Sequence, residues 1–182
     1  MKFIIQVSNP RVCIKEDALK DIESISELIE EIFPMLNEDM ILIWNFIRIP
    51  LEYKYDVSVI INDLLELLQA ILAEDEGEIS IAWPSNTFRS DWNVKWKGQS
   101  LSIDSEWFSI VGLTKDILNK HQKIELSTNE FLAEWKMLLS FLIKIFKEYN
   151  LLELNLEEFD IMKNLIDKIP GVGKYYKEEK CL

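Results

Sequence analysis

The stretch EISIAWPSNTFRSDWNVKWKGQSLSIDSEWFSIVG, residues 78–112, decides the fold because it holds four of the six tryptophans in a strand-like pattern. Large apolar residues alternate with small or polar ones in three runs, Ile79 to Trp83, Trp92 to Trp96 and Leu101 to Ile103. A period of two is typical of a strand that buries one face. We therefore predict an antiparallel meander with one face on the core.

The residues between these runs mark the turns of the meander. Pro84 to Ser90 is polar and predicts a loop, and Gly98 predicts a tight turn. Glu106 to Val111 predicts a separate last strand, which Gly112 ends. We expect the inward tryptophans, Trp92 and Trp96, to pack under a helix.

The sequence before the meander predicts one strand, a helix, a second strand and another helix. The expected ranges are 2–7 for the first strand, 16–33 for a helix ended by Pro34, 40–49 for a single central strand ended by Pro50, and 56–73 for the second helix. An acidic turn, Glu74 to Gly77, joins this helix to the meander.

After the meander we expect a helical turn at 114–119, a short strand at 123–126 and two helices. Ser127 and Glu130 have the spacing of a capping box, which begins the first of these helices. Asn155 and Glu158 repeat that spacing before a last helix at about 156–169. The fold class is therefore α+β, an antiparallel or mixed sheet with a Trp-rich meander packed against several amphipathic helices.

The chain is long and apolar enough for one core. Its 182 residues are 48% hydrophobic, with five glycines and five prolines and no linker-like stretch. We predict a single domain over 1–182, with a loose tail from about residue 171.

The charge is strongly negative and uneven along the chain. The net charge is −12, and residues 1–80 hold 17 acidic against 6 basic side chains. Such a chain repels phosphate, so we expect neither nucleic acid nor a membrane surface as a partner. If the charge serves binding, it favours a basic protein as the partner. The simpler explanation is that the acid excess keeps the protein soluble.

The sequence shows no signal that would direct the chain out of the cytoplasm. Cys13 and Cys181 lie far apart, the first residues lack the apolar run of a signal peptide, and no run reaches membrane length. We expect free thiols in a reducing, cytoplasmic setting.

The residues with catalytic or metal-binding chemistry do not form a recognisable site. The single histidine, His121, lies in a polar run without a nucleophile, and we predict a surface or loop role. The acids of 74–78 lack calcium-loop spacing, and no phosphate-binding glycine loop occurs. Ile169 to Lys174 resembles the hairpin of a helix-hairpin-helix motif, but no second helix follows. We expect no enzyme activity, no cofactor, no metal and no catalytic residue.

Three segments carry a family resemblance: Ile81-Ala82-Trp83, Trp92-Asn93-Val94-Lys95-Trp96 and Phe131-Leu132-Ala133-Glu134-Trp135. In an acidic α+β domain they resemble the small immunity proteins of bacterial polymorphic toxin and contact-dependent growth inhibition systems. The glycine-rich signature of the largest immunity superfamily is absent, so the subfamily stays open. The resemblance implies a tight, neutralising complex with one cognate protein toxin, often a basic nuclease.

The acids of the first half supply the expected partner-binding residues. These are Glu23, Glu27, Glu30 and Glu31, joined by Asp75 and Glu76. Two alternatives remain open. One is a regulatory or interaction domain that binds a small molecule or peptide in a cavity lined by Trp83, Trp92 or Trp107. The other is a hydrolase with paired carboxylates in a cleft.

Overall fold

The Trp-rich stretch forms three long strands of a four-stranded antiparallel sheet in a computed structural model that describes residues 2–8, 10–15, 17–35 and 40–170. The strands are β4 (Glu76–Pro84), β5 (Phe88–Lys97), β6 (Ser100–Ile110) and β7 (Lys123–Ser127), paired in that order. The predicted meander is therefore confirmed, and β7 confirms the short strand expected at 123–126.

Two details of the predicted meander are wrong. Glu106 to Val111 is not a separate strand, because β6 runs unbroken from Ser100 to Ile110 and no turn residue interrupts it. The loop predicted at Pro84 to Ser90 is also shorter, since β5 already begins at Phe88. The register of β5 against β6 shifts at Arg89 and Ser90, which is where the polar pattern had suggested a loop.

A second antiparallel sheet contains three short strands, β1 (Phe3–Val7), β2 (Met40–Trp44) and β3 (Ile47–Leu51), in sequence order. The single strand predicted at 40–49 is wrong, because Asn45 and Phe46 have positive φ values of 47° and 68° and reverse the chain. Pro50 does not end the strand but lies within β3, which is an edge strand and therefore tolerates a missing N–H.

The helix predicted at 16–33 is divided. Residues 18–21 form a 3₁₀ turn, Ile22 is extended with ψ of 119°, and α1 (Ile25–Ile32) begins only after Ser24. The Ser24 hydroxyl accepts a hydrogen bond from the Glu27 N–H, so a capping residue restarts the helix.

The remaining helices lie close to their predicted positions. A π-helical turn (Tyr53–Val57) leads into α2 (Ser58–Ala73), and α3 (Lys115–Leu118), α4 (Thr128–Glu148), a 3₁₀ turn (Leu151–Leu154) and α5 (Glu157–Lys168) follow. The described helices include none that combines the length and apolarity needed to cross a membrane.

The two predicted capping boxes have opposite outcomes. Ser127 and Glu130 form both reciprocal hydrogen bonds at the start of α4, as predicted. Asn155 does not cap α5, because its backbone is left-handed with φ of 53° and Leu156 is the residue before the helix. The carboxylate of Glu158 instead accepts a hydrogen bond from the N–H of Ile25, at the start of α1.

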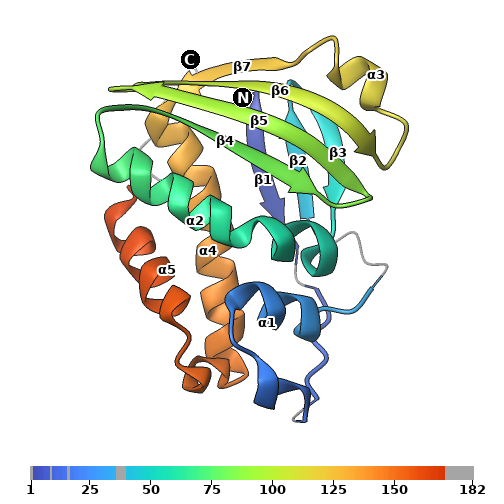
Figure 1. The fold of residues 1–182 in the computed structure, drawn as a ribbon, viewed down its shortest axis with the longest axis vertical. Helices are drawn as coiled ribbons and strands as arrows, with labels where there is room; N and C mark the ends of the chain where they lie inside the picture. Colours follow the sequence, from blue (N-terminus) through green and yellow to red (C-terminus); the bar gives the residue numbers. More distant parts are fainter. Residues whose placement is uncertain (1, 9, 16, 36–39, 171–182) are drawn as a thin grey trace, which may run out of the picture.

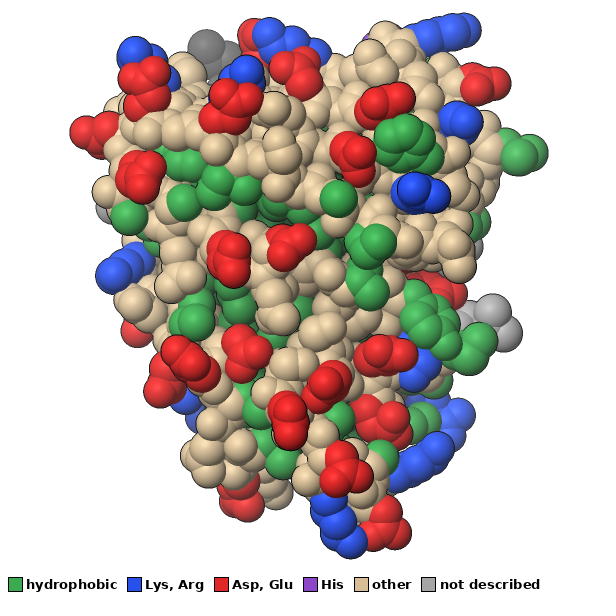
Figure 2. Space-filling model, in the orientation of Figure 1, with side chains coloured by type: hydrophobic (Ala, Val, Ile, Leu, Met, Phe, Trp, Pro, Cys, Tyr) green, Lys and Arg blue, Asp and Glu red, His purple; other side chains and the backbone are tan. Residues whose placement is uncertain are grey.

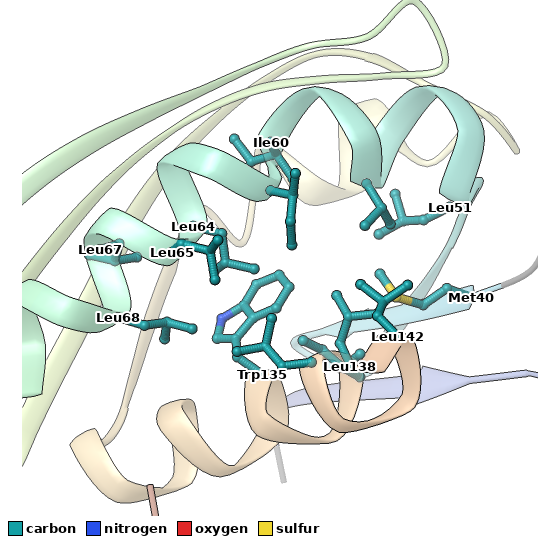
Figure 3. Packing of buried hydrophobic residues seen from close by; sticks show 14 of the residues in the cluster. Met40, Leu51, Ile60, Leu64, Leu65, Leu67, Leu68, Trp135, Leu138 and Leu142 are labelled. Carbon is teal, nitrogen blue, oxygen red and sulfur yellow. The ribbon is translucent and has the colours of Figure 1, made fainter. Parts of the chain in front are cut away.

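The core lies between the two sheets and the helices α2 and α4 (Figure 1). The ring of Trp44 in β2 is 5.2 Å from that of Trp92 and 5.0 Å from that of Trp107. Trp92 thus packs on the second sheet rather than under a helix as expected. Trp135 of α4 lies between the two helices, next to leucines of α2 (Figure 3).

The free edge of β1 is covered by α4. The buried carboxylate of Glu134 accepts a hydrogen bond of 2.8 Å from the backbone N–H of Ile5. A helix side chain here satisfies a strand donor that would otherwise face the interior without a partner.

Candidate functional site

Helix α1 presents acids to solvent because its apolar residues occupy one stripe. Ile25, Leu28, Ile29 and Ile32 are buried, whereas Glu27 and Glu30 are exposed and Glu31 is half-buried. These three acids line a shallow hollow of about 230 Å³ with Asp21 and Lys54. The Lys54 ammonium donates a hydrogen bond to the carbonyl of Glu30, at the C-terminal end of α1.

Glu23 lies just before α1 and faces a different hollow, of about 400 Å³. Its walls come from α2, with Glu66, and from α5, with Glu157 and Glu158. These three glutamates were not among the residues expected from the sequence. They stand on helices about 40 and 130 positions farther along the chain, and only tertiary packing brings them beside Glu23.

Together these carboxylates make a surface that we call the acidic face: Asp21, Glu23, Glu27, Glu30, Glu31, Glu66, Glu157 and Glu158. Figure 2 shows acidic side chains gathered over the lower half of the molecule, where α1 and α5 lie. No carboxylate of the acidic face forms an ion pair with another described residue.

Some of these carboxylates serve the fold itself. Glu27 accepts a hydrogen bond of 2.8 Å from the N–H of Glu23, and Glu158 accepts one of 3.3 Å from Ile25. The side chains of Glu23, Glu30 and Glu66 make no hydrogen bond within the described part of the chain. These three carboxylates therefore have no hydrogen-bond or ion-pair partner among the residues that the structure describes.

Asp75 and Glu76 lie apart from the other expected residues. They follow the C-terminal end of α2, a helix about 24 Å long by its 16 residues, whereas α1 lies near the other end (Figure 1). The acidic turn predicted at 74–77 is shorter than expected, because β4 begins at Glu76. Glu76 is paired with Lys97 of β5 at 2.7 Å, so its charge is already balanced.

The tryptophan rings form a packed core. Trp83, Trp92 and Trp107 are each no more than 2% exposed and contact one another or Phe88 at centroid distances of 4.7 to 6.3 Å. The four-stranded sheet carries two open hollows of about 620 and 480 Å³, lined by both polar and apolar residues of its strands. Trp96 is among the residues that line the first hollow, and Trp92 is among those that line the second.

The histidine lies at the surface, as predicted. His121 is exposed, and its backbone carbonyl accepts a 2.8 Å hydrogen bond from the indole N–H of Trp44. Within the described residues, no three His, Cys, Asp or Glu side chains stand close enough to hold a metal ion. The segment from 171 onward, including Cys181 and the end of the hairpin-like motif, lies outside the described residues.

Comparison with known proteins found no relative of this chain. No family model matches it, and no curated protein or solved structure is significantly similar to it.

Proposed function

We propose that this chain is an immunity protein that binds a cognate bacterial toxin in the cytoplasm of the producing cell and neutralises it. The observation that carries the proposal is the acidic face, whose carboxylates are exposed or half-buried and have no ion-pair partner among the described residues. The six tryptophan rings, by contrast, are buried in the core.

Charge complementarity supplies the mechanism. Carboxylates spread over three helices present a negative surface to the Lys and Arg residues with which a nuclease toxin holds phosphate. Such a surface accelerates the encounter and occupies the residues that the nucleic acid would need. The binding energy then comes from the apolar and polar contacts at the centre of the complex rather than from the rim charges.

The buried tryptophans favour this function over a ligand-binding domain. A small-molecule or peptide cavity among these rings requires space between Trp83, Trp92 and Trp107, and the rings pack against one another instead. Trp92 also borders the open hollow of about 480 Å³, but it is only 2% exposed there. The proposal therefore places the partner on the helices.

The test begins with co-purification of the tagged chain with the C-terminal domain of a large toxin encoded immediately beside its gene. Association rates are then measured for the wild type and for a variant with Glu23→Lys, Glu30→Lys and Glu66→Lys. We expect the variant to associate about tenfold or more slowly at about 50 mM NaCl, because electrostatic steering is lost. At about 500 mM NaCl the two rates should converge, because salt screens exposed charges.

A matched control places the same charge change on another surface. Asp91→Lys, Asp104→Lys and Glu106→Lys alter three exposed acids on the outer face of the sheet. This control should associate within about twofold of the wild type. Equal slowing by both triple variants would mean that net charge, and not the acidic face, governs the encounter; failure to form any complex would reject the immunity function.

A further inference from the structure

A groove runs between α2 and α5, and four acids of the acidic face line one end of it. The hollow of about 400 Å³ at Glu23 lies next to a second one of about 210 Å³, and Gln69 of α2 lines both. From α2 and α5 the first hollow is lined by residues 62, 65, 66, 69, 157, 158 and 161, and the second by residues 69, 72, 73, 164, 165 and 168. Because both sets advance together, α2 and α5 run in the same general direction (Figure 1).

Apolar side chains from both helices form part of the floor of this groove. Leu65 and Leu72 of α2 line it opposite Ile161 and Leu165 of α5. Leu72 and Ile161 are half-buried, so part of the floor remains accessible to solvent. Figure 2 shows hydrophobic side chains between the acidic ones on this face. An apolar floor inside a charged rim is typical of grooves that receive an amphipathic helix.

The rim is charged differently at its two ends. Glu23, Glu66, Glu157 and Glu158 line one end, beside the middle of α2 and the first turn of α5. Lys168 lines the other end, near Ala73. Glu157 and Glu158 stand in the first turn of α5, where acids stabilise the helix dipole, and Glu158 also bonds to α1. Neither role accounts for Glu23, Glu66 or the apolar floor.

We propose that this groove receives an amphipathic helix of the partner protein, antiparallel to α2 and α5, with its basic residues in its last turns. The identity of that partner rests on the proposed function. In this orientation the C-terminal end of the incoming helix, where Lys and Arg are most favourable, meets the four glutamates. Its dipole then opposes those of α2 and α5, and its apolar stripe faces Leu65, Leu72 and Ile161.

Two peptides of identical composition test the orientation. The first is an amphipathic helix of about 16 residues with leucines at i, i+3, i+4 and i+7 and with its Lys and Arg in the last two turns. The second has the reversed sequence, which moves the basic residues to the first turns. We expect the first peptide to bind the full chain about fivefold or more tightly in a fluorescence anisotropy titration at about 50 mM NaCl. Equal affinities would reduce the interaction to general charge attraction and reject the proposal.

A groove-blocking variant tests the location. Gln69 is exposed where the two hollows meet, so Gln69→Trp should fill the groove without disturbing the core. We expect affinity for the first peptide to fall about tenfold or more. Circular dichroism verifies that the variant is folded, and Glu106→Trp on the sheet is the control. Unchanged binding by folded Gln69→Trp would overturn the assignment.

The toxin complex separates this inference from the proposed function. If the toxin binds and Gln69→Trp leaves its affinity unchanged, the groove inference fails and the immunity function stands. If no toxin binds but the peptides show the expected preference and Gln69→Trp abolishes it, the groove stands and the immunity function fails.

Discussion

At the residue scale, the contact between Gly77 and Trp96 shows how closely the meander is packed. The two residues are cross-strand partners in β4 and β5, and a Cβ added to Gly77 would lie only 2.2 Å from Cζ2 of Trp96. The indole N–H of Trp96 donates to the carbonyl of Glu74 at 2.9 Å, which holds the ring over the glycine. Position 77 therefore requires glycine because of a neighbouring side chain, not because of its own backbone angles.

Gly77→Ala should lower the free energy of unfolding by about 1–3 kcal/mol, because the Trp96 ring must move to admit a methyl group. Urea denaturation measures the change. In a Trp96→Phe background the smaller ring leaves room, so the same substitution should then cost less. An equal cost in both backgrounds would show that the ring is not the obstacle.

Glu134 is a buried acid whose pKa is changed by that burial. Its side chain is 3% exposed, and this burial raises the pKa of the carboxyl above its ordinary value of 4.5. The hydrogen bond from Ile5 lowers that pKa in part, and the charge of Glu130 raises it again. Since the folded protein holds the proton more tightly than the unfolded chain, stability is lost as pH rises from about 4.5 through the raised pKa.

Glu134→Gln should remove this pH dependence while keeping an oxygen that accepts from Ile5. We expect the stability of the variant relative to the wild type to increase from pH 4.5 upward and then to level off. Chemical denaturation at several pH values measures the difference. Glu148→Gln makes the same charge change at an exposed position of α4 and should show a smaller trend. Parallel pH curves for wild type and Glu134→Gln would contradict the argument.

At the element scale, the helix starts show when a short motif determines structure and when it does not. Ser127 and Glu130 form a capping box because β7 delivers Ser127 in an extended conformation, with φ of −75° and ψ of 145°. Asn155 and Glu158 have the same spacing, but the turn after α4 leaves Asn155 left-handed. Glu158 is then free to bind the start of α1. Spacing alone does not distinguish the two cases, since the backbone of the capping residue decides.

Substitutions at the two positions should separate these roles. Ser127→Ala should cost about 1 kcal/mol, because the N–H of Glu130 loses its acceptor. Asn155→Gly should change stability by only a few tenths of a kcal/mol, because glycine adopts the left-handed conformation without strain. Both values follow from urea denaturation. A loss at Asn155→Gly as large as that at Ser127→Ala would mean that Asn155 has a further role.

At the scale of the whole molecule, folding gathers acids from the first half of the chain and from α5 into the acidic face. The acidic excess of residues 1–80 could be counted from the sequence. Glu23, Glu66, Glu157 and Glu158 lie together because α1 and α5 pack against the same side of α2. Carboxylates gathered in this way repel one another, and the repulsion decreases with added salt.

The melting temperature should therefore increase between about 20 and about 300 mM NaCl, over which the screening length falls from about 20 Å to about 6 Å. The variant with Glu23→Lys, Glu30→Lys and Glu66→Lys should melt higher at low salt and respond less to added salt. Thermal unfolding followed by circular dichroism gives both values. An identical salt response in the two proteins would indicate that repulsion within the acidic face does not lower the melting temperature.

The sequence by itself determined the α+β class, the meander and the long helices. Strand alternation and the apolar stripe of a helix are local patterns, because each follows from burying one face of one element. The sequence also determined the alternation that places Trp83, Trp92 and Trp96 on one face. The pair of strands at 40–51 was missed because Asn45-Phe46 lacks the glycine that usually marks such a turn. The start of α1 was missed because apolar spacing continued past Ser24.

Only the tertiary structure decided which sheet covers Trp92, which helix start receives Glu158, and which acids share the groove. Asp75 and Glu76 were grouped with Glu23 by composition, and the length of α2 separates them. Glu23 and Glu157 were never linked by any local pattern, yet they line one hollow. The physical reason is the same throughout: periodicity reports which face of an element is buried, but not which distant element buries it.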